Sequence, residues 1–167
     1  MFDDKIMIGQ QLIELFLLIP TSVLIFSDLR YRSVSLFWLG LFGLSVFFSA
    51  ILSFPLNGII YNSLLNIILL CWMVGGVWLY LKLRYRGQRN DFNQYCGSGD
   101  LIFMLLLTPQ VTLSEYFILL FGGCLLGLAY WCIMRITARR VVTIPLVSAI
   151  GSIFTIQLFY RFYTNFS

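Results

Sequence analysis

The sequence predicts an all-α integral membrane protein with six transmembrane helices, of which the fourth is short. Of its 167 residues, 60% are hydrophobic and only 11% are charged, whereas a soluble domain carries charge on about a quarter of its residues. Apolar runs recur along the chain, and most of them approach the roughly 20 residues that a helix needs to cross a bilayer. Basic residues gather between alternate runs, as expected for loops on one side of a membrane.

The first three expected spans are long apolar segments. The first covers Ile8–Phe26 and the second Val34–Phe54. Pro55-Leu56-Asn57-Gly58 follows, and its proline and glycine predict a tight turn. The third span covers Ile59–Leu81 and ends in aromatic residues of the kind that gather at a membrane interface.

The fourth span is shorter than a membrane crossing. It covers Leu101–Leu107 and is closed by Thr108-Pro109. Seven helical residues rise about 10 Å, against a hydrocarbon core of about 30 Å. Either the helix begins before the preceding glycines and draws Asp100 into the membrane, or the helix crosses only part of it.

The last two spans are expected at Leu113–Met134 and Val141–Tyr160. The first of these contains Gly123-x-x-x-Gly127, a spacing that permits close helix approach. Ser148 and Ser152 repeat a spacing of small residues in the second, and we interpret both pairs as packing positions.

The basic residues predict the orientation. With the loop after the first span inside, nine basic residues lie inside and two outside, which is a strong bias. We therefore expect a multi-pass protein of a bacterial-type inner (cytoplasmic) membrane with both termini outside. The net charge of +4 is explained by this topology and membrane lipids, so no nucleic-acid partner is expected. The inside residues are Arg30, Arg32, Lys82, Arg84, Arg86, Arg89, Arg135, Arg139 and Arg140, and the outside residues are Lys5 and Arg161.

The residue types exclude several chemistries. Histidine is absent, which excludes a zinc metalloprotease and the usual serine and cysteine proteases. The four cysteines form no C-x-x-C pair, so neither a zinc knuckle nor a dithiol site is expected. We expect no metal and no organic cofactor. Any hydrolysis in the membrane would depend on carboxylates.

Two aspartates are candidates for such a pair. Asp28 follows the first span and Asp100 precedes the fourth, so the topology puts both at one depth on the inner side. Two carboxyls sharing a site ionise unequally, which supplies a general base and a general acid. Arg30 or Arg32 could bias which one stays charged. Glu14 lies about 21 Å from Asp28 along one helix, too far for a pair.

At these residues the sequence resembles the type IV prepilin peptidase family. Gly97-Ser98-Gly99-Asp100 matches the G-x-G-D motif of intramembrane aspartyl proteases, and Asp28-Leu29-Arg30-Tyr31-Arg32 resembles the family's first aspartate region. Ile144-Pro145-Leu146 resembles its Ile-Pro segment. The resemblance implies an endopeptidase with Asp28 and Asp100 catalytic and Gly97 and Gly99 as motif glycines. Its partner would be a prepilin or pseudopilin-like membrane protein with a basic leader, cut at the cytoplasmic face after a glycine.

The chain departs from the family at two positions. Ser33-Val34-Ser35 stands where Ile-Pro-Asn is frequent, and Ile102 stands where a lysine is common. We interpret residues 1–167 as one peptidase domain, without the N-terminal methyltransferase domain of many members. Two other hypotheses remain open at this point. The aspartates could form the site of a proton- or cation-coupled transporter, or the protein could be a non-catalytic component of a pilus or secretion machine.

Overall fold

The computed structural model describes residues 2–31, 33–84, 97–136 and 145–164. Within these ranges the regular secondary structure is entirely helical. The order of helices along the chain is the predicted one. The helices are α1 (Phe2–Tyr31), α2 (Leu36–Ser53), α3 (Leu56–Arg84), α4 (Ser98–Leu107), α5 (Leu113–Ile136) and α6 (Leu146–Thr164).

Five of these helices, α1, α2, α3, α5 and α6, are long and apolar enough to cross a membrane. The fold is therefore that of an all-α, multi-pass membrane protein. The remaining helix, α4, has 10 residues and rises about 15 Å, which is half of a bilayer core.

Some predicted boundaries differ from the observed ones. The tight turn at 55–58 is wrong, because α3 begins at Leu56 and the N–H of Ile59 donates to the carbonyl of Pro55 in a helical bond of 3.0 Å. A proline just before a helix is favourable because it lacks the N–H that would have no acceptor there. The first helix continues beyond Phe26 to Tyr31, so Asp28 lies inside it. The beginning predicted for the last span, Val141, lies outside the described residues.

A core of aromatic rings joins three helices. The ring of Phe42 on α2 stacks on Phe103 of α4 at 5.0 Å between centroids. The same ring meets Phe154 of α6 edge-on at 6.1 Å. All three side chains are at most 1% exposed. This contact fixes the position of α4 against α2 and α6.

The turn after α4 is buried and held by polar side chains. The amide of Asn66 on α3 donates to the carbonyls of Thr108 and Val111, at 2.9 and 2.8 Å. The amide of Gln110 donates to the hydroxyl of Ser49 on α2 at 2.7 Å. A chain that turns inside a membrane protein needs such partners, because lipid offers no hydrogen bonds to its backbone. These bonds explain how α4 can end within the bundle.

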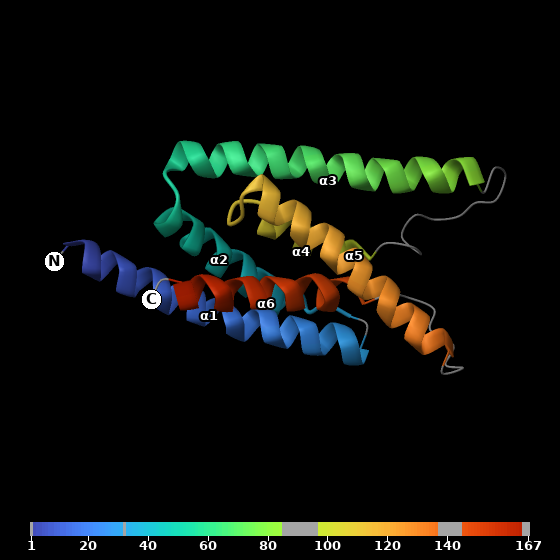
Figure 1. Ribbon diagram of the computed structural model, residues 1–167, viewed down its shortest axis with the longest axis horizontal. Helices are drawn as coiled ribbons and strands as arrows, with labels where there is room; N and C mark the ends of the chain where they lie inside the picture. The colour runs from blue at the N-terminus through green and yellow to red at the C-terminus, as the bar shows by residue number, and fades with distance from the viewer. Residues whose placement is uncertain (1, 32, 85–96, 137–144, 165–167) are drawn as a thin grey trace.

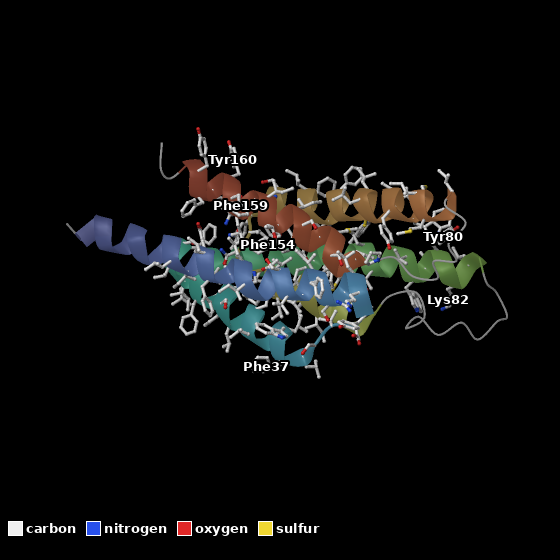
Figure 2. The ribbon with its side chains drawn as sticks, turned by 90° about the horizontal axis from the view of Figure 1, so that it is seen from below. Phe37, Tyr80, Lys82, Phe154, Phe159 and Tyr160 are labelled. Atoms are coloured by element: carbon white, nitrogen blue, oxygen red, sulfur yellow. The ribbon has the colours of Figure 1, made fainter. Side chains whose placement is uncertain are left out.

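The helices pack unevenly. Helices α1 and α6 lie side by side, while α3 runs along the opposite side of the molecule (Figure 1). The apolar window of α3 is 11% buried, against 22–39% in the other four long helices. Figure 2 shows Tyr80 and Lys82 together near the C-terminal end of α3, where the ammonium of Lys82 lies 4.7 Å from the ring centroid of Trp78. Aromatic and basic residues of this kind mark a membrane interface.

Candidate active site

Asp28 lies near the end of α1 and faces the beginning of α6. Its side chain is 6% exposed. Its Oδ2 accepts two hydrogen bonds from Ser148, one from the backbone N–H at 2.8 Å and one from the hydroxyl at 2.6 Å. The hydroxyl of Ser27, one residue earlier, donates to the carbonyl of Ser33 at 2.7 Å. This bond ties the end of α1 to the segment that leads into α2.

The first turn of α6 supplies backbone donors. Pro145 precedes the helix and its carbonyl accepts the N–H of Ala149. The N–H groups of the residues between them have no acceptor within the helix. The aligned peptide dipoles also place partial positive charge at this end. An anionic side chain is therefore stabilised there.

Asp100 is the third residue of α4 and meets the same turn of α6. Its carboxylate accepts hydrogen bonds from the backbone N–H groups of Gly97 and Val147. Its own N–H donates to the carbonyl of Gly97 at 3.1 Å, a backbone bond in the first turn of α4. Asp28 and Asp100 thus bind the neighbouring amides of Ser148 and Val147.

Asp100 is harder to ionise than an aspartate in water. It lies outside the five helices that are long enough to cross a membrane. Burial raises the pKa of Asp100 from its ordinary value of 3.8 to about 6, and the nearby charge of Asp28 acts in the same direction. The N–H groups of Gly97 and Val147 offset part of this rise. The two aspartates therefore interact electrostatically, as a pair sharing one site does.

The two motif glycines lie at close contacts. A Cβ on Gly97 would lie 3.1 Å from Oδ2 of Asp100, and a Cβ on Gly99 would lie 3.1 Å from the side chain of Val34. Both separations are tighter than ordinary van der Waals contact. The segment Ser33-Val34-Ser35, which departs from the family pattern, therefore packs directly on the G-x-G-D motif through its valine.

Arg30 does not join the pair of aspartates. The guanidinium of Arg30 lies over the rings of Phe26 and Tyr31, at 5.8 and 5.4 Å from their centroids. Residues two apart on a helix point to different sides, so Arg30 is exposed while Asp28 is buried. Arg32 lies outside the described residues.

Two cavities lie away from the aspartates. An apolar groove of about 500 Å³ separates α3 from α4; Ile102, at the position where the family often has lysine, is part of its wall. A second cavity of about 280 Å³ contains Glu14, which is 3% exposed. Neither lining includes Asp28 or Asp100. No group of three metal-ligating side chains occurs among the residues described.

Ser148 is the site residue that the sequence analysis assigned to packing. Its spacing from Ser152 is typical of small residues at a helix contact, and the hydroxyl of Ser152 does donate to the carbonyl of Ser148 at 2.7 Å. The signal that could have found it is Pro145, which marks a helix start three residues earlier. Free amides and a hydroxyl in a first turn favour an anionic partner.

A scan against models of known protein families gave no match, and searches of curated proteins and of solved structures gave none either. The functional argument therefore depends on the geometry of the site and on the motifs of the sequence.

Proposed function

We propose that this protein is a membrane aspartyl endopeptidase that cleaves the leader peptides of type IV prepilin-like proteins. One observation carries the proposal. Asp28 and Asp100 come from helices far apart in the sequence, and their carboxylates bind neighbouring amides of the first turn of α6. Two carboxylates that bind adjacent amides, one of them with a raised pKa, are typical of an acid–base pair.

The mechanism is hydrolysis by activated water. The ionised carboxylate takes a proton from a water molecule, and the protonated one gives its proton to the oxygen of the scissile carbonyl. A tetrahedral intermediate forms without a covalent bond to the enzyme. Its collapse breaks the C–N bond, the proton taken from water passes to the leaving amine, and the carboxylate that had donated its proton takes one back from a hydroxyl of the intermediate. The partial positive charge at the start of α6 favours the negative charge that the pair carries throughout.

The substrate class and the location follow from the motifs and the charge pattern. The G-x-G-D motif and the aspartate segment at the end of the first helix support a prepilin or pseudopilin as the substrate. The bias of basic residues supports six helices in a cytoplasmic membrane, with both termini outside and the pair at the cytoplasmic face. In this arrangement α4 would cross only part of the bilayer.

Cleavage of a co-expressed prepilin tests the proposal. We expect the wild-type protein to release a mature product whose N-terminus is read by sequencing. Asp28→Asn and Asp100→Asn should each lower the cleavage rate by roughly 100-fold or more, the contribution of a general acid or base. Both variants should still accumulate in the membrane.

Glu14→Gln is the matched control, because Glu14 is also a buried carboxylate on α1. It should cleave at the wild-type rate. Full cleavage by either aspartate variant would rule out the pair. If the wild-type protein accumulates but leaves the leader uncut, the result favours the hypothesis of a non-catalytic assembly protein.

Glu14 favours a second candidate, a proton- or cation-coupled transporter. An ionisable side chain buried in a membrane-spanning helix is costly and frequently marks an ion path. Glu14 also borders a cavity formed with α6 residues such as Leu158 and Phe159. Proton flux into liposomes without any peptide, lost in Glu14→Gln, would support transport over proteolysis.

A further inference from the structure

Ser148 contacts Asp28 through two separate donors. The backbone N–H and the hydroxyl of Ser148 lie 2.8 and 2.6 Å from one oxygen, Oδ2. The same hydroxyl is 3.3 Å from the carbonyl of Ile25, so its proton is directed mainly at Asp28. Ser148 therefore places two donors on Oδ2 of Asp28, and a carboxylate oxygen can accept both because it has two lone pairs.

Asp100 has a different environment. Its donors are two backbone amides, those of Gly97 and Val147, and it is only partly buried. Its pKa is raised to about 6, first by burial and then by the charge of Asp28. Among the described residues around it, α6 presents Val147 and Ser148, and the charged group that faces it is Asp28 on α1. Of the contacts named here, those of Asp28 include a side-chain hydroxyl, whereas those of Asp100 come from backbone amides.

We propose that Ser148 is a positioning residue that orients Asp28 as the proton acceptor of the pair and leaves Asp100 as the proton donor. The inference deepens the proposed peptidase function and rests on it. In the reaction, Oδ1 of Asp28, the oxygen not bonded to Ser148, takes the proton from water while the proton of Asp100 passes to the scissile carbonyl. As the C–N bond breaks, Asp28 gives this proton to the leaving amine and Asp100 takes back a proton from a hydroxyl of the tetrahedral intermediate, so that a carboxylic acid is released and both residues return to their starting forms.

The kinetic test compares Ser148→Ala with Ser148→Thr. The alanine variant loses the hydroxyl but keeps the backbone N–H. Its kcat for leader cleavage should fall roughly 10- to 100-fold, the effect of one hydrogen bond to a charged group, with KM unchanged. Ser148→Thr keeps a hydroxyl and should restore kcat to near the wild-type value.

Ser152→Ala is the matched control. Ser152 lies one turn further along α6 and loses a comparable bond, the one to the carbonyl of Ser148. It should leave kcat unchanged. Equal losses in Ser148→Ala and Ser152→Ala, or no rescue by threonine, would reduce Ser148 to a packing residue and overturn the proposal.

A second measurement does not depend on cleavage. Dicyclohexylcarbodiimide modifies protonated carboxyls, and the modified residue is located by mass spectrometry. At pH 5, below the pKa of about 6 of Asp100, it should label Asp100 but not Asp28 in the wild-type protein, and Asp28 should become labelled in Ser148→Ala. Labelling of Asp28 in the wild-type protein would overturn the assignment. If this pattern is found in a protein that cleaves no prepilin, the peptidase proposal fails and the assignment of Ser148 stands.

Discussion

At the scale of single residues, the burial of Asp100 that suits it to be the proton donor of the proposed peptidase also has a cost in stability. Its pKa in the folded protein is about 6, above its ordinary value of 3.8. Between these two values the folded state binds more protons than the unfolded state, so stability falls as the pH rises through this window. Above it, the ionised Asp100 remains unfavourable in the folded protein.

Asp100→Asn should therefore stabilise the protein at alkaline pH while abolishing cleavage. We expect a Tm a few degrees higher than that of the wild-type protein at pH 8, because the variant removes a partly buried charge next to Asp28. At pH 4 the gain should largely disappear, since Asp100 is then protonated in the folded wild-type protein. Thermal unfolding in detergent at the two pH values measures this. A Tm that does not rise at pH 8 would contradict the electrostatic account of the pair.

The sequence indicated the carboxylates of this site but not their partners. Asp28 and Asp100 stood out because ionised side chains beside long apolar runs are rare and costly. Ser148 did not, because serine is ordinary in a membrane helix and its role depends on a contact across 120 residues. Arg30 was a plausible neighbour in the sequence, but the helix turns it away from Asp28. These roles depend on tertiary contacts, which cannot be read from local sequence patterns.

At the scale of helices, the contact between α5 and α6 determines where the first turn of α6 lies. A Cβ on Gly123 would overlap the side chain of Ile150 and come within 3.3 Å of its Cα. A Cβ on Gly122, beside it, would lie 2.7 Å from the side chain of Ile153. In a membrane no hydrophobic force drives helices together, because the lipid tails are as apolar as the helix surfaces. Helices therefore associate through such close van der Waals packing. The predicted use of Gly123 as a packing position is confirmed.

Gly123→Leu should separate α6 from α5 and disturb the site at the start of α6. We expect a loss of about 1–3 kcal/mol in the free energy of unfolding, the usual cost of overpacking, together with slower cleavage. Gly40→Leu on α2 is the control, because beyond its two chain neighbours and the nearby backbone of its own helix no atom lies within 4 Å of its Cβ position. Unfolding in a denaturing detergent measures both variants. Equal stability of the two would show that the glycine contact contributes little.

The existence of the helices was easier to predict than their ends. Long apolar runs identify membrane helices because a membrane demands length and apolarity together. The prediction of a tight turn at Pro55–Gly58 was wrong because these residues also fit the first turn of a helix. The short α4 was predicted from the sequence, but the contacts that hold its end were not. The side chain of Asn66, on α3, donates hydrogen bonds to two backbone carbonyls in the turn after α4.

At the scale of the whole molecule, the helices run in alternating directions, which brings the end of one and the beginnings of others together at one end of the bundle. The end of α1 and the beginnings of α4 and α6 meet at the aspartates, through contacts with Val147 and Ser148. At the opposite ends of α5 and α6, Glu115 and Arg161 form an ion pair of 2.7 Å. The count of basic residues predicts that the aspartate end faces the cytoplasm.

Cysteine labelling tests this orientation in a variant whose own four cysteines are replaced. Ser35 is exposed before α2, at the aspartate end, and Ser114 is exposed in the first turn of α5, at the other end. In intact spheroplasts a membrane-impermeant maleimide should label Ser114→Cys and leave Ser35→Cys unlabelled. In inverted membrane vesicles the two results should be exchanged. Labelling of Ser35→Cys in intact spheroplasts would put the aspartates on the outer face, where a leader held in the cytoplasm could not reach them, and the proposed substrate class would fall with the topology.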